Sequence, residues 1–418
     1  MPTSLNRPDG GFFKILKKDK KTKARLGVLN TPHGKIMTPS YVFVGTYGKI
    51  RHLIPRDIKR TKTQIVIANT FHLWDKALLS KTSGKKALGK TFLTKSFGLN
   101  IPTMTDSGGF QVLSLAFGDK NRVGKFMTGE IKKDSNYKRS KIRITQKGVY
   151  FNFEKKPPLL AGPRHRRWSF LGPELSMKLQ SKIGADIIFA FDHITSPLDD
   201  YEYNKKAIEL TDKWAKICLK TRSPKQMLFG IVQGGLFKDL RTKSAKSIGA
   251  MDFDGFGIGG SYTKKQISKI LKWVIPYLPE EKPRHLLGVG KVADIFEAVQ
   301  NGVDAFDCVI PTREARHGRL YTKTGHIDIR KGKYTNDKKI IEGGCTCQTC
   351  SSKISRSKIR ELIKSDNIKL NAAGQRYCLM HNMWFFNNLL EEIRKSIQKS
   401  KFKEFKKKFL KKFSNPPQ

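Results

Sequence analysis

Long apolar runs are missing from this sequence of 418 residues. No stretch approaches the roughly 20 consecutive apolar residues that a transmembrane helix needs, and residues 1–21 lack a hydrophobic segment long enough for a signal peptide. We therefore expect a cytoplasmic protein that does not insert into a membrane.

Acidic residues are also scarce, because 35 Asp and Glu stand against 82 Lys and Arg, which gives a formal charge of +47. Solubility requires far less charge, so the excess favours a polyanionic partner, with nucleic acid first. A proteome that is rich in lysine throughout is the alternative explanation.

Cysteine is rare, but three of the six cysteines lie within the segment CTCQTC at 345–350. This clustering is typical of metal binding in a reducing compartment rather than of a disulfide framework. Cys345, Cys347 and Cys350, with His381 as fourth ligand, would close the shell of a structural zinc ion. Cys378 is a rival fourth ligand, and a metal-free thiol cluster is the remaining alternative.

The segment between residues 63 and 310 alternates short apolar runs with stretches of helical periodicity. The predicted strands lie in TQIVIANT, IPTMTDSGG, ADIIFAFD, MLFGIVQGG, FDGFGIGG, HLLGVG and VDAFDCV. The predicted helices include 174–183, 203–219, 263–275 and 292–301. Such alternation implies a parallel sheet, and seven or more units favour a closed (β/α)8 barrel of the TIM type. A doubly wound open sheet is the alternative, although no G-x-G-x-x-G turn follows the first strand.

The rest of the chain suggests three departures from a plain barrel. Within a catalytic barrel domain at 1–340 we expect a long basic insertion at about 119–170, which is either an RNA contact or a solvated loop. A zinc-binding subdomain follows at 341–385. Phe402, Phe405 and Phe409 lie at helical spacing among lysines, so 386–418 is expected to form a basic amphipathic helix that packs on the barrel.

Polar residues and glycines recur where the predicted strands end. They are Asp106, Asp192, Gln233, Gly260, Gly288 and Asp307. In a barrel these ends converge on the C-terminal rim, where barrel enzymes carry their chemistry. Two carboxylates that face one sugar can act as nucleophile and as acid and base, and a third can accept the two adjacent N–H donors of guanine. Each aspartate alone could instead cap a helix or hold a turn.

These residues stand in motifs that closely resemble tRNA-guanine transglycosylases. The motifs are TDSGGFQ at 105–111, IVQGG at 231–235, GIGG at 257–260, LLGVG at 286–290, FDCVIPTREARHGRLYT at 306–322 and CTCQTC. The resemblance runs from about Ser40 to His381 and is strongest to the bacterial, queuosine-pathway branch. It implies exchange of the wobble guanine of G-U-N anticodons for a 7-deazaguanine, through a covalent aspartyl-ribose intermediate.

The resemblance also implies a role for each motif residue. Asp307 is the expected nucleophile and Asp106 the general acid or base. The residues expected to bind the base are Asp192, Gln233, the backbone N–H of Gly260, the sandwiching Phe110 and Leu287, and the pocket residues Ser107 and Asn69. Arg313 and Arg316 are expected to contact the anticodon loop of the tRNA. The bacterial members of this family are homodimers, so the resemblance also implies a homodimer.

Two departures from the family pattern leave the identity of the deazaguanine open. SYTKK at 261–265 replaces the usual stretch with an acidic residue, and Ile194 replaces a cysteine of the pocket. A non-catalytic tRNA-binding subunit, which the presence of both Asp106 and Asp307 disfavours, and an archaeosine-type transglycosylase are the alternative functions. A zinc-dependent DNA-binding protein would leave the rim aspartates unexplained.

Overall fold

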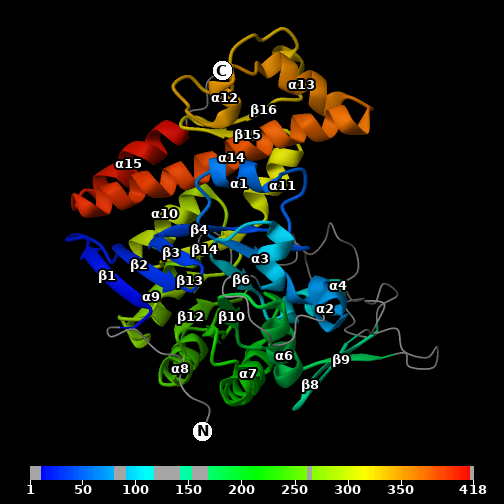
Figure 1. The fold of residues 1–418 in the computed structure, drawn as a ribbon. Coiled ribbons are helices and arrows are strands. Elements are labelled where there is room, and N and C mark those ends of the chain that lie inside the picture. The colour runs from blue at the N-terminus through cyan, green and yellow to red at the C-terminus, as the bar shows by residue number, and fades with distance from the viewer. Residues whose placement is uncertain (1–10, 80–90, 117–141, 153–167, 261–265, 415–418) are drawn as a thin grey trace.

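The computed structural model describes residues 11–79, 91–116, 142–152, 168–260 and 266–414. Its centre is a closed barrel of parallel strands surrounded by helices (Figure 1), which confirms the predicted fold class. In chain order the barrel strands are β4 (Ser40–Val44), β5 (Val66–Ala68), β6 (Thr103–Thr105), β10 (Ile187–Phe189), β11 (Met227–Val232), β12 (Gly255–Ile258), β13 (Arg284–Leu286) and β14 (Ala305–Cys308).

Strand β4 is the one barrel strand that the sequence pattern does not predict. It begins two residues after β3 (Gly34–Thr38), a strand of a different sheet, and no helix separates the two. The alternation of strand and helix that identifies the other seven strands is therefore absent at this point. Strand β4 closes the barrel by pairing in parallel with both β14 and β5.

The helices outside the barrel confirm the predicted segments, except that residues 263–265 of the predicted helix 263–275 lie outside the described residues. Local signals mark where such helices begin and end. Helix α6 (Pro173–Ile183) has proline at its first position and ends at Gly184, which adopts a left-handed φ of 75°, the usual asymmetry of helix ends. The other helices between or after barrel strands are α1 (Pro55–Arg60), α2 (Thr70–Leu79), α3 (Phe92–Phe97), α4 (Gly109–Ala116), α7 (Tyr201–Thr221), α8 (Lys238–Gly249), α9 (Ile267–Val274) with the 3-10 turn η2 (Ile275–Tyr277), α10 (Val292–Gln300) and α11 (Ile310–Arg316).

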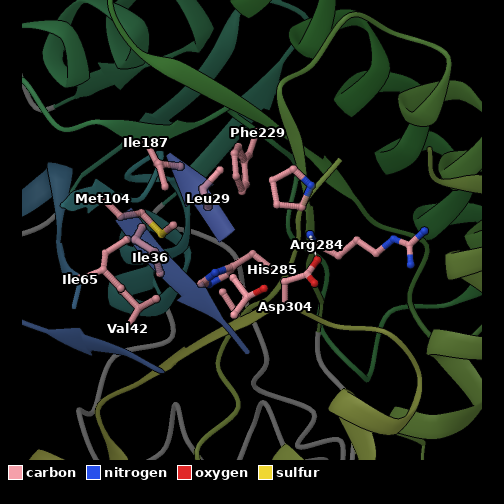
Figure 2. Close-up of a pocket in the computed structure, with 13 residues that line it drawn as sticks. Leu29, Ile36, Val42, Ile65, Met104, Ile187, Phe229, Arg284, His285 and Asp304 are labelled. Carbon is pink, nitrogen blue, oxygen red and sulfur yellow. Dashed lines mark hydrogen bonds between the residues drawn. The ribbon is translucent and has the colours of Figure 1, made fainter. Parts of the chain in front are cut away.

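A small antiparallel sheet closes the N-terminal end of the barrel. Strands β1 (Phe13–Lys18), β2 (Arg25–Thr31) and β3 form it. Leu29 and Ile36 of this sheet face barrel residues such as Met104 and Phe229 around a cavity of only about 10 Å³ (Figure 2). The barrel is thus filled by side chains rather than open.

One buried ion pair ties this sheet to the barrel. Arg25 of β2 donates from Nε to Asp304 at 2.9 Å, and the partners are almost fully buried. The carboxylate of Asp304 also accepts the backbone N–H of Arg284 at 2.7 Å. Asp304 therefore joins the closing sheet to two neighbouring barrel strands.

The predicted basic insertion falls largely outside the described residues. What is described is an antiparallel sheet of β7 (Ile142–Thr145), β8 (Gly148–Phe151) and β9 (Ser169–Leu171). The indole N–H of Trp214 on α7 donates to the carbonyl of Gln146 at 2.8 Å. This bond attaches the small sheet to the barrel helices.

The C-terminal part lies against one side of the barrel. Helix α14 (Ile368–Gln398) runs between the barrel and a group of short elements (Figure 1). These elements are β15 (Arg319–Thr322), β16 (Gly325–Asp328), η3 (Gly332–Tyr334), α12 (Gln348–Ser351) and α13 (Arg356–Lys364). Because α14 spans residue 385, one continuous helix crosses the expected subdomain boundary, and the domain division stays a prediction.

The last helix, α15 (Phe402–Phe413), packs through its aromatic face. The ring of Phe296 on α10 lies 6.2, 5.8 and 5.4 Å from the rings of Phe402, Phe405 and Phe409. The predicted amphipathic helix thus covers the core with its phenylalanines. In the part of the chain that is described, every helix is too short or too polar to span a bilayer.

Candidate active site and metal centre

Asp106 lies directly after β6, in a net of hydrogen bonds at the C-terminal rim of the barrel. Its Oδ1 accepts the backbone N–H groups of Thr70 at 2.9 Å and Gly108 at 3.1 Å, and its Oδ2 accepts the Asn69 amide at 2.7 Å. Burial and, to a smaller extent, the charge of Asp307 raise the pKa of Asp106 to about 7, although these hydrogen bonds lower it. Asp106 is therefore poised both to give and to take a proton near neutral pH.

Asp307 lies at the end of β14 and is partly exposed on the same rim. Its Oδ1 is 2.8 Å from Nε2 of His285, a fully buried residue of β13, and 3.5 Å from the backbone N of Gly288. The charge of Asp307 raises the pKa of Asp106. The two predicted carboxylates therefore interact at the same rim, although they are 201 residues apart in sequence. His285 is not predicted from the sequence; the signal for it is a histidine at the start of the apolar run HLLGVG.

Asp192 is the centre of a second, more deeply buried cluster. Gln233 donates from Nε2 to Asp192 Oδ2 at 2.6 Å, and the hydroxyl of Ser107 lies 3.4 Å from Oδ1. Burial raises the pKa of Asp192 to about 6, so the carboxylate is still mostly ionised at pH 7. The cluster therefore joins the ends of three adjacent strands, β6, β10 and β11.

Gly260 adjoins this cluster at the end of β12, with a left-handed φ of 109°. A Cβ at this position would lie 3.3 Å from Gln233 Oε1 and would collide with the guanidinium of Arg241. Arg241 is fully buried and donates to the carbonyls of Gly235 at 2.8 Å and Gly259 at 2.7 Å. Arg241, which the sequence does not single out, thus fixes both glycine loops relative to each other.

The two predicted base-stacking residues, Phe110 and Leu287, each follow the end of a barrel strand. Phe110, in the first turn of α4, is 40% exposed, and Leu287, just after β13, is partly buried. The segment 261–265, whose sequence departs from the family pattern, lies outside the described residues. Ile194 is partly buried and packs against the main core.

The two predicted RNA-binding arginines lie on α11, which begins three residues after Asp307. Arg313 is exposed and Arg316 is partly buried. The pKa of Arg316 is lowered by burial and by the positive charges of Arg51 and Arg313. Arg51, in the turn before α1, is an additional cation that the sequence does not single out. Three guanidinium groups therefore lie together beside the rim, an arrangement that favours an anionic partner.

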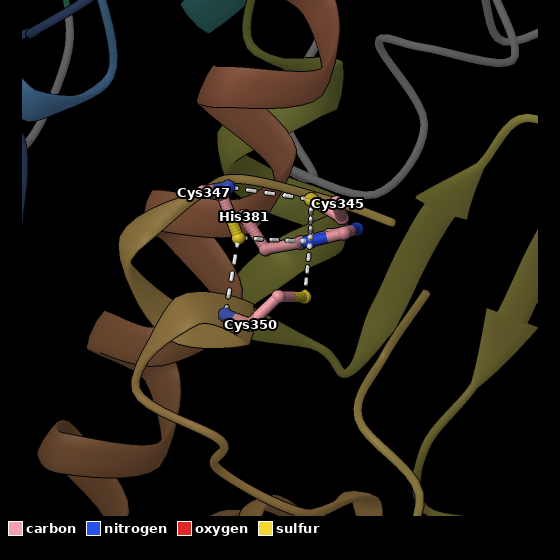
Figure 3. Close-up of side chains that lie close together, drawn as sticks. All are labelled: Cys345, Cys347, Cys350 and His381. Carbon is pink, nitrogen blue, oxygen red and sulfur yellow. Dashed lines mark hydrogen bonds between the residues drawn. The ribbon is translucent and has the colours of Figure 1, made fainter. Parts of the chain in front are cut away.

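The four predicted metal ligands converge in one buried cluster (Figure 3). Nδ1 of His381 lies 3.8, 3.4 and 3.7 Å from the sulfurs of Cys345, Cys347 and Cys350. Among the described residues the cluster has no further member. The alternative prediction that Cys378 is the fourth ligand is therefore wrong; Cys378 is buried on α14 outside the cluster. The structure therefore brings three cysteines and one histidine close enough together to hold a metal ion, and we call these four residues the metal-binding cluster.

The metal-binding cluster is linked to the rim through helix α14. Nε2 of His381 is 2.7 Å from the carbonyl of Tyr321, and the neighbouring Asn382 amide donates to the carbonyls of Pro311 at 3.1 Å and Arg319 at 3.0 Å. Pro311 belongs to the first turn of α11. The cluster thus supports the helix that follows Asp307.

The closed barrel, the acidic residues gathered on its C-terminal rim and the Cys3His cluster define a (β/α)8-barrel enzyme with a metal-binding region. A family model described as "Queuine tRNA-ribosyltransferase" matches residues 19–415. Similar proteins include a putative queuine tRNA-ribosyltransferase of Archaeoglobus fulgidus, 38% identical over 404 residues (92% of this chain and 96% of that protein). The queuine tRNA-ribosyltransferase of Desulforamulus reducens is 38% identical over 409 residues (96% and 98%). The chain therefore belongs to the queuine tRNA-ribosyltransferase family of pentosyltransferases.

Proposed function

We propose that this protein exchanges the wobble guanine of tRNAs with G-U-N anticodons for a 7-deazaguanine, through a covalent bond between Asp307 and the ribose. The single observation that carries the proposal is the pairing of two unlike carboxylates across one rim. Asp307 is partly exposed and lies within hydrogen-bond distance of His285, whereas Asp106 accepts three hydrogen bonds and has a pKa raised to about 7 by burial. A nucleophile beside a proton carrier is what base exchange on a sugar requires.

In the first half of the proposed reaction, an Asp307 oxygen attacks C1′ of the ribose as the bond from C1′ to N9 of guanine breaks. Asp106, protonated, gives its proton to the departing guanine. In the second half, the incoming base loses the equivalent proton to Asp106 and its nitrogen attacks C1′. The bond to Asp307 then breaks, and both carboxyl groups return to their starting states.

Recognition of the base is assigned to the buried cluster around Asp192. An ionised carboxylate accepts from guanine N1–H and the 2-amino group together. Gln233 and the backbone N–H of Gly260 are proposed to bind the same edge, and Phe110 and Leu287 to stack on its two faces. Stacking combined with contacts to the edge is the usual way in which proteins bind an extruded base. Asn69 and Ser107 are proposed to line the pocket beside the two aspartates.

We propose Zn²⁺ as the ion of the Cys3His cluster, with a structural role. A tetrahedral zinc ion holds a bound sulfur and a bound nitrogen about 3.6 Å apart, and the three observed separations of 3.4 to 3.8 Å fit that geometry. Four protein ligands complete the shell. Protein purified without chelator should contain about one zinc per chain, and less than about half an equivalent would contradict the assignment.

Contacts to the tRNA are proposed for Arg313 and Arg316, supported by their neighbour Arg51. Changing Arg313 and Arg316 together to alanine should raise KM for tRNA much more than it alters guanine binding. Equal effects on both would argue against an anticodon contact. A homodimer in the cytoplasm remains part of the proposal, and the oligomeric state is measurable by light scattering.

The decisive experiment is incorporation of labelled guanine into unmodified tRNA with a G-U-N anticodon, followed by mapping of the labelled nucleotide. Label at the wobble position is expected, whereas label in the tRNA core would favour the archaeosine-type reaction. No label above background from zinc-loaded protein would reject catalysis and favour the non-catalytic subunit. Asp307→Asn should abolish the trapped covalent RNA adduct. Asp252→Asn, at the opposite end of the barrel and exposed, is the matched control that should retain it.

A further inference from the structure

His285 is a fully buried histidine whose two ring nitrogens have very different surroundings. Nε2 lies 2.8 Å from Oδ1 of Asp307. Nδ1 is also buried, and none of the described protein groups forms a hydrogen bond with it. The ring lies in the barrel interior among side chains such as Val42, Ile65 and Met104 (Figure 2), and its centroid is 5.4 Å from that of Phe189.

This environment determines which nitrogen carries the proton. An ionised Asp307 can only accept a hydrogen bond, so Nε2 of His285 must be the donor. Nδ1, which lies among apolar groups, then carries no proton in the neutral ring. Two charged residues, Arg284 and Asp304, line the same cavity as His285. Both interact with other groups and not with Nδ1 of His285. Arg284 donates to the carbonyl of Leu278 at 3.2 Å, and Asp304 pairs with Arg25.

The two oxygens of Asp307 are consequently unequal. Oδ1 receives the His285 donor and approaches the Gly288 backbone N at 3.5 Å. Within the described part of the chain, Oδ2 has no hydrogen bond, and the Asp307 side chain is 17% exposed at the rim. The buried His285 ring therefore contacts one oxygen of Asp307, whereas the other oxygen has no partner among the described groups.

We propose that His285 is a positioning residue that aims the free oxygen of Asp307 at the sugar carbon. The inference rests on the proposed function, because it gives Asp307 the role of nucleophile. His285 itself lies beneath the rim and touches no substrate. Its contribution is geometric: it restricts rotation of the carboxylate in the ground state, so less orientational freedom is lost when the covalent bond forms.

Two variants and one control separate positioning from packing. His285→Phe keeps a ring of similar size but removes the donor, whereas His285→Gln supplies an amide N–H at a comparable distance from the backbone. Phe189→Leu disturbs the same core without changing the hydrogen bond. For each, the rate of covalent RNA adduct formation in a single turnover, KM for tRNA and the midpoint of thermal unfolding are measured.

We expect His285→Phe to slow adduct formation by about 10-fold to 100-fold, with KM for tRNA changed by less than about threefold. His285→Gln should recover most of the rate, and Phe189→Leu should lower the unfolding midpoint while the rate stays near that of the wild type. In ¹⁵N spectra of histidine rings, the His285 signals should show the Nε2–H tautomer and shift in Asp307→Asn.

Three results would overturn the inference and leave the proposed function standing. An undiminished rate in His285→Phe would do so, as would equal losses of rate in His285→Phe and Phe189→Leu, which would indicate a packing role. A His285 ring protonated at Nδ1 alone would remove its premise. Absence of any exchange by the wild-type protein would overturn the proposed function and this inference with it, whereas wild-type exchange with an unaffected His285→Phe rate overturns only the inference.

Discussion

Asp106 should make the protein less stable as the pH rises, and replacement of Asp106 by asparagine should remove this effect. Below about pH 4, Asp106 is protonated in both the folded and the unfolded chain. Between about pH 4 and pH 7, the unfolded chain loses this proton but the folded chain keeps it, because burial raises the folded pKa from 3.8 to about 7. The unfolded state then binds fewer protons, so the free energy of unfolding falls with pH.

The size of the effect follows from the pKa difference. Each unit corresponds to about 1.4 kcal/mol, so the full penalty above pH 7 is about 4 kcal/mol. Over the accessible interval from pH 5 to pH 8, the two pKa values predict a loss of about 2.5 kcal/mol that Asp106→Asn should escape. Because the carboxyl group is partly exposed at the rim, this value is an upper limit. The amide that Asp106→Asn introduces can turn a donor toward the donor of Asn69, which adds a cost of about 1 kcal/mol that does not change with pH.

The assay is urea unfolding of the wild type and Asp106→Asn, both loaded with zinc, at pH 5, 6, 7 and 8. The difference between their free energies of unfolding should shift in favour of the variant by about 2 kcal/mol across the series. Asp366→Asn, an exposed change between α13 and α14, serves as control. A difference for Asp106→Asn that stays constant within about 0.5 kcal/mol would refute the argument that burial holds a proton on this group.

Three further predictions concern the buried ion pair, the glycine at the end of β12 and the metal-binding cluster. Arg25→Ala leaves the buried carboxylate of Asp304 without its partner and should lower the free energy of unfolding by about 3–5 kcal/mol in urea, with KM for tRNA unchanged; a loss below about 1 kcal/mol would contradict it. Gly260→Ala places a Cβ against Arg241 at a position with a left-handed backbone, so it should lower the free energy of unfolding in urea by about 1–3 kcal/mol. It should also weaken guanine binding in calorimetry, and an affinity equal to that of the wild type would count against the proposed pocket. Cys350→Ser, or chelation of the metal, should lower the unfolding midpoint and raise KM for tRNA, and re-addition of zinc should reverse only the effect of chelation.

Much of the architecture could be predicted from local sequence features. Strand and helix periods are short-range properties, so seven barrel strands and the main helices follow from the apolar pattern. The chain itself confines Cys345, Cys347 and Cys350 to one turn. These three cysteines, together with His381, are therefore recognisable from the sequence as a set of metal ligands. The strand-end positions of Asp106 and Asp307 likewise follow from where the apolar runs stop, because all parallel strands of a barrel end at the same rim.

Other properties depend on contacts across the fold. Strand β4 is identified by its pairing with β14 and β5, not by its own neighbours in sequence. The pKa of Asp106 depends on its burial and on the charge of a residue 201 positions away. His285 in sequence is one histidine at the start of an apolar run, and only the closure of the barrel brings its Nε2 to Asp307. Local sequence determines what each segment can form, whereas desolvation and through-space charge, which act between distant segments, are decided when those segments pack together.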